Sequence, residues 1–406
     1  MTIDPAIRRG LQSHIAAPRL ETPFHSRLAA LSTTNDWYSW AGYKAPHSVF
    51  DGELEYFAIR STAALFDISP MVKYRIKGPD AERFLNRLTL RDVRKLGVGR
   101  VHYTAWCDDH GHVLDDGTLF RLSDQDFRLC CQERHLPWLV DSARGFSVEI
   151  AEETEDLAGL ALQGPTSYAV LEAAGFTGVE HLRPFQLALF EHDGGIAVVS
   201  RTGFTGDLGY EIFVSADTAL TLWDRLWQAG QPLGIQAIGY EALNRARIEA
   251  GFIVANADFI TAETALRPDR ERLPDEIGLD WLVDVEKPYF NGRDAILEAR
   301  RRNSLRYILV GLEIDGNIPA EHALVYHRKK KEAGLVTAAI WSPLAKRNIA
   351  IATLERPYGE RIVDDLWVEI YALRELQYHK LMKRAKIVPR PFVKLDRRSA
   401  TPPGHF

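Results

Sequence analysis

A carboxylate closes a glycine-rich segment at residues 201–211, and this combination could form a ligand-binding turn. The segment reads Arg-Thr-Gly-Phe-Thr-Gly-Asp-Leu-Gly-Tyr-Glu, and the apolar, strand-like run Ile-Phe-Val follows it. Glycine is needed where the backbone turns with positive φ or passes close to another group. Glu211 therefore lies at the mouth of a glycine-built turn. Its carboxylate either accepts hydrogen bonds from a ligand or pairs with a core cation such as Arg201.

The spacing of the glycines excludes two common phosphate-binding motifs. They recur every third residue, which does not match the Gly-x-Gly-x-x-Gly pattern of dinucleotide-binding turns. A Walker loop would require a following Gly-Lys-Ser/Thr, which the segment lacks. The segment therefore does not indicate a nucleotide site.

Two adjacent carboxylates, Asp115 and Asp116, begin a strand-like run after the turn at residues 108–112. Successive residues of a strand face opposite ways, so only one of the two can point into a given cavity. The other would lie on the far face of the sheet or bond to the turn at Asp109. From the residues alone, an acidic flank of a turn is the more ordinary interpretation, and an acid–base group is the alternative.

Composition limits the class of protein. The chain has 406 residues, of which 46% are hydrophobic, and its net charge of −5 comes from interspersed charges. It is long enough for two or three domains and gives no reason to expect a nucleic-acid partner. No run approaches the roughly 18 apolar residues of a membrane helix, and the N-terminus does not resemble a secretory signal.

The three cysteines, Cys107, Cys130 and Cys131, are typical of reduced thiols in the cytoplasm, where we expect the protein to reside. Adjacent Cys130 and Cys131 would point to opposite faces of a strand, which argues against a shared metal. We therefore predict no metal site.

The pattern of elements predicts two related α+β modules followed by a β domain. Residues 77–85 and 163–171 each follow an apolar strand and share a Gly-Pro-x-x-x-x-x-Leu frame, in which Pro lies near the start of a helix. Short strands dominate beyond residue 303. We expect a first lobe from residues 1–50 and 150–240, a second from 51–149 and 241–302, a C-terminal β domain at 303–393 and a tail at 394–406. The first 20 or so residues resemble a loosely held arm.

The glycine-rich segment resembles the folate-binding signature of the glycine-cleavage T-protein (aminomethyltransferase) family, which reads close to Ser-Arg-Thr-Gly-Tyr-Thr-Gly-Glu-x-Gly-(Phe/Tyr)-Glu. Further segments match the family in its order along nearly the whole chain. They are residues 65–71, 111–116, 161–165, 247–251 and 342–343. The resemblance implies an α+β, three-lobed cloverleaf with a C-terminal barrel-like β domain and tetrahydrofolate in a central channel.

The resemblance also implies roles for individual residues. The second acid of the pair, Asp116, would be catalytic, because a carboxylate beside the N5/N10 edge of folate can stabilise positive charge or handle a proton. Glu211 would accept hydrogen bonds from the pterin N3–H and 2-amino groups. Tyr103 matches a tyrosine of the folate channel and Met71 a pocket-lining methionine, although both are also ordinary core residues.

Other candidate folate contacts are less specific. Phe204 replaces the usual tyrosine and keeps only its ring, and Gln132 stands where the family has Asn, although a glutamine at a strand end is more often solvated. Cys130 would line the same wall, and Arg247 begins a matching segment. The resemblance implies a basic residue near the C-terminus for the glutamyl tail of folate. Candidates are Arg390, Lys394 and Arg397.

Departures from the T-protein lie on the substrate side. His-Met-Gly becomes Pro-Met-Val at residues 70–72, an expected Arg is Leu243, and the loop at residues 252–272 is longer and differently charged. We therefore expect the same acceptor and a different donor: a demethylase that moves a methyl group from a small O-, N- or S-methyl compound to tetrahydrofolate, giving 5-methyltetrahydrofolate. Aromatic residues near the expected channel do not choose the donor. They are Trp37, Tyr38, Trp40, Tyr43, Trp106 and Phe120.

Two alternatives remain. A glycine-cleavage T-protein would take an aminomethyl group from a lipoylated carrier protein and give 5,10-methylenetetrahydrofolate. A non-catalytic folate-binding protein of iron–sulfur assembly is disfavoured, because residues 249–255 lack the cysteine of that group and Asp116 is retained.

Overall fold

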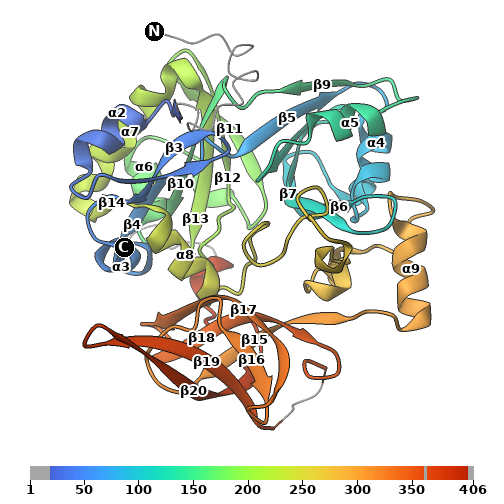
Figure 1. Ribbon diagram of the computed structural model, residues 1–406. Helices are drawn as coiled ribbons and strands as arrows, with labels where there is room; N and C mark the ends of the chain where they lie inside the picture. Colours follow the sequence, from blue (N-terminus) through green and yellow to red (C-terminus); the bar gives the residue numbers. More distant parts are fainter. Residues whose placement is uncertain (1–18, 361–363, 401–406) are drawn as a thin grey trace.

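The structure is a computed structural model that describes residues 19–360 and 364–400. An α+β body lies against a closed β-barrel, which is coloured orange to red in Figure 1. Among the described residues, no helix is long and apolar enough to cross a membrane. The first described residues form a small sheet of order β1-β3-β2. Its strands are β1 (Leu20–Glu21), β2 (Asp36–Trp40) and β3 (Tyr43–Ser48), and α2 (His25–Leu31) lies between β1 and β2 in the sequence.

The second lobe is built on a five-stranded antiparallel sheet of order β6-β7-β8-β5-β9. Its strands are β5 (Val72–Lys77), β6 (Arg100–Cys107), β7 (Val113–Ser123), β8 (Asp126–Cys131) and β9 (Glu149–Glu152), and its helices are α4 (Ala81–Leu88) and α5 (Leu136–Ser142).

The first lobe is built on a six-stranded sheet of order β11-β12-β13-β10-β4-β14. Its strands are β4 (Ala63–Asp67), β10 (Leu157–Gln163), β11 (Leu187–His192), β12 (Gly195–Ser200), β13 (Gly209–Ser215) and β14 (Ile235–Ala237), and its helices are α6 (Ser167–Ala173) and α7 (Ala219–Gly230).

The two lobes repeat one plan. Each runs strand, helix, three-stranded meander, helix, strand: β5-α4-β6-β7-β8-α5-β9 and β10-α6-β11-β12-β13-α7-β14. Gly78 and Gly164 open the equivalent helices with φ of +135° and +118°. A Cβ would lie 2.4 Å from Ser147 O at the first and 2.5 Å from Thr62 O at the second, so only glycine fits at either position. The shared Gly-Pro frame thus marks equivalent turns.

The two large sheets meet at an edge and across their faces. Val101 of β6 donates its N–H to Phe185 O, and Leu187 of β11 donates to Gly99 O, both at 2.9 Å. Phe120 of β7 packs edge-on against Phe213 of β13, with ring centroids 5.7 Å apart. A buried apolar cluster that contains both rings fills the space between the sheets, next to the packed pair α3 (Gly52–Ser61) and α8 (Tyr240–Glu249).

Pairing of β4 corrects one predicted boundary. Residues 51–149 were expected in the second lobe, but β4 pairs with β10 and with β14 in the sheet of the first lobe. Both partners lie far away in the sequence, so the local pattern contained no signal for this pairing.

The C-terminal domain is a closed barrel of order β15-β18-β17-β16-β19-β20. Its strands are β15 (Tyr307–Ile314), β16 (Leu324–His327), β17 (Lys331–Ser342), β18 (Arg347–Glu355), β19 (Leu366–Arg374) and β20 (Gln377–Val388), and α9 (Arg293–Arg302) leads into it. The basic run at residues 328–331 lies at the tip of the β16–β17 hairpin.

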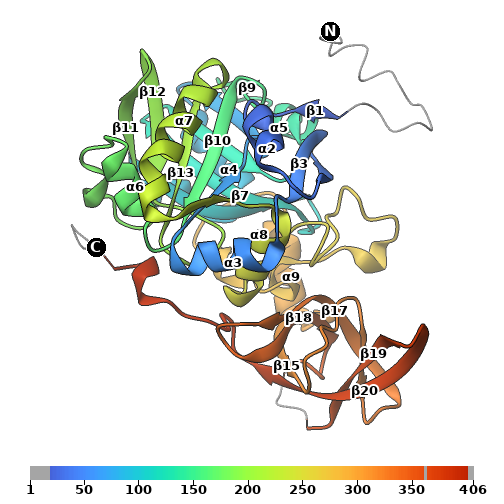
Figure 2. The same ribbon diagram turned by 90° about the vertical axis from the view of Figure 1, so that its left-hand side faces the viewer.

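The described part of the tail returns to the body. In Figure 2, the segment after β20 leaves the barrel and runs back along the first lobe. Arg397 binds both carboxyl oxygens of Asp207, at 2.5 and 2.8 Å. Asp207 also pairs with buried Arg60, so the tail is tied to the glycine-rich segment. The expected N-terminal arm falls mainly on residues 1–18, outside the described residues.

Candidate functional site

A hydrogen-bonded acid–phenol pair lies on adjacent strands of the five-stranded sheet. Tyr103 of β6 donates its hydroxyl to Asp116 Oδ2 of β7 at 2.7 Å. The two side chains share one face, because Ala105, two residues after Tyr103, is directly opposite Asp116. Burial raises the pKa of Asp116 to about 7, and the negative charge of Asp115 adds to the rise. The carboxyl group can therefore exchange a proton near neutral pH.

Asp115 faces the other side of the sheet, as strand alternation predicts. Its side chain is buried and lies 3.0 Å from His135 Nε2. It also accepts the backbone N–H of Asp116 at 2.8 Å and that of Glu133 at 3.1 Å. It is thus fixed by His135 and the strand ends, whereas the turn at Asp109 was the partner considered from the sequence.

Arg247 lies on α8 with its side chain buried and paired with Asp258. Asp258 also accepts hydrogen bonds from the backbone N–H of Val254 at 2.9 Å and from the hydroxyl of Thr337, on the barrel strand β17, at 2.7 Å. The negative charge of Asp258 also contributes to the raised pKa of Asp116. Arg247 therefore balances a charge behind Asp116. Its predicted contact with folate stays a prediction.

An exposed tryptophan that sequence reasoning missed lies beside the acid–phenol pair. Trp281 is 61% exposed and stacks on the ring of Tyr103, with centroids 6.1 Å apart and an interplanar angle of 27°. Arg91 lies over the Trp281 ring at 5.9 Å and donates to Tyr103 O at 3.2 Å. Trp281 belongs to a short turn that periodicity does not mark, so no signal in the sequence placed it here.

Glu211 lies on β13 of the facing sheet. It accepts a hydrogen bond from Thr202 Oγ1 at 2.6 Å, and burial raises its pKa. Arg201, the cation considered as its partner, instead donates to the backbone oxygens of Leu182, at 3.0 Å, and of Ala400. Within residues 19–360 and 364–400, Glu211 forms no ion pair. The core-charge interpretation with Arg201 is therefore wrong.

Two of the three glycines allow the Gln163 side-chain amide to bond the turn that precedes Glu211. The side chain of Gln163 lies so close to Gly203 and Gly209 that an added Cβ would come within 2.1 and 2.3 Å of its Oε1. Its Nε2 donates to the backbone oxygens of Thr202 and Tyr210 at 3.3 Å. Close approach of a side chain is thus what glycine supplies here.

The remaining candidate contacts occupy the space between the sheets to different degrees. Met71 and Phe204 are partly buried and pack against the apolar cluster there, and Phe204 stacks on Phe252 with centroids 5.4 Å apart. Cys130 belongs to that cluster, and burial raises the pKa of its thiol to about 12. Gln132 is partly exposed, and its amide has no hydrogen-bond partner in the described part of the chain.

Strand register places these groups on two facing walls. Tyr103 of β6, Thr118 of β7 and Cys130 of β8 form a row across one sheet, and Asp116 lies beside it. On the other sheet, Glu211 shares a face with Phe213, the residue that contacts the first wall. The structure therefore brings Asp116, Tyr103 and Cys130 together and sets Glu211 opposite. Trp106 points away, into the outer core of the second lobe.

Of the three C-terminal cations, Arg397 is already paired with Asp207, which excludes it as a free cation for the glutamyl tail. Arg390 donates to Gly251 O at 3.1 Å, and its charge acts on Tyr103. Lys394 is exposed.

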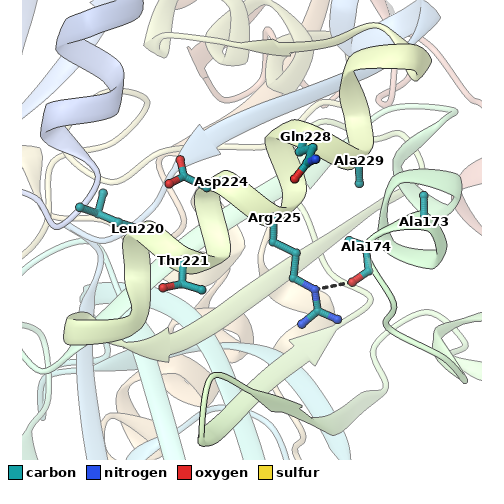
Figure 3. Close-up of a pocket in the computed structure, with 8 residues that line it drawn as sticks. All are labelled: Ala173, Ala174, Leu220, Thr221, Asp224, Arg225, Gln228 and Ala229. Atoms are coloured by element: carbon teal, nitrogen blue, oxygen red, sulfur yellow. Dashed lines mark hydrogen bonds between the residues drawn. The ribbon is translucent and has the colours of Figure 1, made fainter.

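Two surface cavities lie away from these walls. One, of about 760 Å³, is lined by α6 and α7, and Figure 3 shows Arg225 in it, bonded to Ala174 O. Its acid, Asp224, is paired with Arg27. The other, of about 490 Å³, lies beside His135 and Glu263. Neither is lined by Asp116 or Glu211.

Comparison with known proteins identifies the family to which this fold and sequence are similar. The chain matches the family model described as the GCVT N-terminal domain over residues 24–287 and that of the glycine cleavage T-protein C-terminal barrel domain over residues 308–394. The crystal structure of the glycine cleavage system aminomethyltransferase T from Bartonella henselae superposes with a TM-score of 0.80 and 25% identity, covering 92% of this chain and 98% of that one.

Curated relatives extend the comparison. An aminomethyltransferase of Lysinibacillus sphaericus is 31% identical over 337 residues, which cover 82% of this chain and 89% of the relative. A trimethylamine-oxide aldolase of Ruegeria pomeroyi is 34% identical over 362 residues, or 85% of this chain. The chain spans only 44% of that relative's length.

The family matches and the fold thus define a folate-dependent one-carbon transferase. The chain belongs to the glycine-cleavage T-protein (aminomethyltransferase) family. Tetrahydrofolate is its one-carbon acceptor, as the sequence predicted. The α+β body with a C-terminal barrel is likewise confirmed.

Proposed function

We propose that this protein transfers a methyl group from a small O-, N- or S-methyl donor to tetrahydrofolate and forms 5-methyltetrahydrofolate. The observation that carries the proposal is the pairing of Asp116 with Tyr103 on one wall and a cation-free Glu211 on the other. Asp116 and Tyr103 stabilise charge and transfer protons, and the carboxylate of Glu211 binds tetrahydrofolate.

The residues present fit the acceptor. Among the described residues, one carboxyl oxygen of Glu211 has no hydrogen-bond partner. The side-chain amide of Gln132 also has none there. A carboxylate that accepts adjacent N–H groups fixes the orientation of a flat ring. Met71, Phe204 and Cys130 would supply apolar contact with that ring.

Bound tetrahydrofolate supplies the nucleophilic nitrogen that receives the methyl group. Asp116, with a pKa of about 7, can take up a proton at that nitrogen or stabilise its positive charge. Tyr103 holds one carboxyl oxygen in place by its hydrogen bond. The aromatic wall of Tyr103 and Trp281 limits access of water.

The donor side favours a compound other than an aminomethylated carrier. Leu243, where the T-protein has Arg, is buried in the apolar cluster between the sheets and supplies no cation there. Trp281 offers an exposed aromatic ring next to Tyr103, which suits apolar contact with a small methylated compound. By its name, the Ruegeria pomeroyi relative acts on trimethylamine oxide, a small methylated amine oxide.

The glycine-cleavage reaction is the second candidate, because several relatives that match four-fifths of the chain are named aminomethyltransferases. The non-catalytic alternative receives no support from these names.

An assay with labelled donors distinguishes the candidates. Purified protein and tetrahydrofolate are incubated with a panel of trideuteromethyl amines, sulfonium compounds and aryl ethers, or with an aminomethylated lipoyl carrier. We expect the label in 5-methyltetrahydrofolate, and Asp116→Asn as control should abolish its formation. Exclusive reaction with the carrier, giving 5,10-methylenetetrahydrofolate, would show that the methyl-transfer proposal is wrong.

A further inference from the structure

A buried imidazole lies between two carboxylates directly behind Asp116. His135 Nε2 is 3.0 Å from Asp115 Oδ2, and Nδ1 is 2.8 Å from Glu263 Oε2. The His135 side chain is 1% exposed and that of Glu263 is 56% exposed. Nε2 lies in hydrogen-bond geometry with Asp115, whereas Nδ1 meets Glu263 as an ion-pair contact without that geometry. Only the imidazolium form carries a positive charge, so this form suits both carboxylates. Burial alone would lower the pKa of His135, but the two carboxylates outweigh it and raise that pKa.

The position of His135 is fixed by its surroundings. Its backbone N–H donates to Tyr74 Oη at 2.7 Å, and its ring packs edge-on against Trp106 with centroids 5.6 Å apart. His135 directly precedes α5. A ring held in this way cannot turn from Asp115 to another acceptor without repacking the core of the second lobe.

Asp115 connects this imidazole with the catalytic side of the strand. One oxygen of Asp115 contacts His135, and the other accepts the backbone N–H of Asp116. We infer that His135 is a positioning residue that, supported by Glu263, sets the ionisation of Asp116 by neutralising Asp115. An uncompensated charge on Asp115 would oppose ionisation of the adjacent carboxyl group.

Of the charged groups that affect the pKa of Asp116, Asp115 is the one that contacts His135. The negative charge of Asp258 also raises the pKa of Asp116, but Asp258 is paired with Arg247. Tyr103 is uncharged and donates a hydrogen bond to Asp116. The groups facing His135 are Asp115, Glu263, Glu133 and the neighbouring Arg134, which pairs with Glu152.

Glu263 belongs to the loop that departs from the T-protein pattern. Asn256 and Thr264 are joined by a hydrogen bond of 2.7 Å, and Asn256 donates to Glu133 at 3.3 Å, so the loop is anchored beside His135. The 490 Å³ cavity lined by His135 and Glu263 lies at the outer end of this arrangement. The loop that distinguishes this chain is therefore connected to its catalytic carboxylate.

The test is the midpoint at which Asp116 titrates. The role in turnover rests on the proposed function, but the titration itself can be followed without substrate by carboxyl-carbon NMR of labelled aspartate, with Asp116→Asn to assign the signal. His135→Gln keeps a neutral donor for Asp115, and we expect the midpoint to rise by about one pH unit. The kcat/KM at pH 7 should then fall about fivefold and recover near about pH 9.

Two further variants and a control complete the design. Asp115→Asn should shift the midpoint downward, and Glu263→Gln, an exposed partner, should shift it upward by less than His135→Gln. His181→Gln, at an 84% exposed site, should leave it unchanged. An unchanged midpoint in His135→Gln, with activity lowered equally at every pH, would overturn the inference. If His135→Gln does not fold, an unchanged midpoint in Glu263→Gln overturns it. If no methyl donor of the panel reacts, only the proposed function is contradicted, because the titration of Asp116 is measured without substrate.

Discussion

At the scale of single residues, Asp116 and Glu211 differ in their neighbours although burial raises the pKa of both. Asp116 lies near two other carboxylates, Asp115 and Asp258, which favour its protonated form. Glu211 accepts one side-chain hydrogen bond, from the hydroxyl of Thr202, and forms no ion pair with any residue that the structure describes. The Asp116 carboxyl group is thus suited to proton transfer, and that of Glu211 to accepting hydrogen bonds from the N–H groups of an uncharged ring.

The rate of methyl transfer should depend on the ionisation of Asp116. If its carboxylate takes up the proton, kcat should rise as the pH increases through about 7 and then reach a plateau. Asp116→Asn should lower kcat by about 100-fold or more and change the affinity for tetrahydrofolate by less than about threefold. Between about pH 5.5 and about pH 8.5, the ratio of ionised to protonated Asp116 changes by about 30-fold on each side of the midpoint. A flat pH profile over this range would contradict this role.

Asp116→Asn should also stabilise the fold at alkaline pH. The folded-state pKa of about 7 lies above the ordinary value of 3.8, so the folded protein binds this proton more tightly than the unfolded chain. The ionised group therefore costs stability increasingly as the pH rises towards 7. At about pH 8 the free energy of unfolding should increase by about 4 kcal/mol in the variant, with little gain near about pH 4. Urea denaturation at the two pH values measures it.

At the scale of elements, local patterns predicted most strands and helices, because alternation and Gly-Pro starts are local signals. They also predicted that Asp115 and Asp116 face opposite ways. The partners of these residues were not predictable: His135 is 20 residues from Asp115 in sequence, and Trp281 reaches Tyr103 from a distant turn. Likewise, β4 (Ala63–Asp67) pairs with β10 and β14, which begin only at Leu157 and Ile235, and periodicity does not encode such pairing.

The turn that carries Trp281 should determine recognition of the donor. If a small methylated compound packs on this ring, Trp281→Ala should raise the KM for the donor about tenfold and leave the affinity for tetrahydrofolate unchanged. Leu266→Ala, at a 98% exposed position, serves as the control for surface effects. An equal loss of donor and folate affinity would instead indicate a structural role for Trp281.

At the scale of the whole molecule, the barrel supports the site from outside. Thr337 of β17 bonds Asp258, and Ser342 bonds Glu249 at 2.5 Å, while Glu249 in turn pairs with Arg60. These buried contacts join the barrel to α8 and α3. The acceptor site therefore depends on all three parts of the chain.

Loss of one such contact should destabilise the whole protein. Thr337→Val leaves an oxygen of buried Asp258 without its donor, which should lower the free energy of unfolding by about 1–3 kcal/mol. Chemical denaturation followed by fluorescence would measure the change. Separate transitions for barrel and body in the wild-type protein would show that the contact does not couple them.

The claim that two repeated lobes hold tetrahydrofolate between facing carboxylates is tested most directly by calorimetric titration of the acceptor into wild type and Glu211→Gln. Gln keeps the shape but loses the charge and one acceptor, so the affinity should fall about 30-fold. Glu191→Gln, an exposed residue of β11 in the same sheet, should bind as the wild type does. Equal affinity in wild type and Glu211→Gln would contradict the assignment of the folate site.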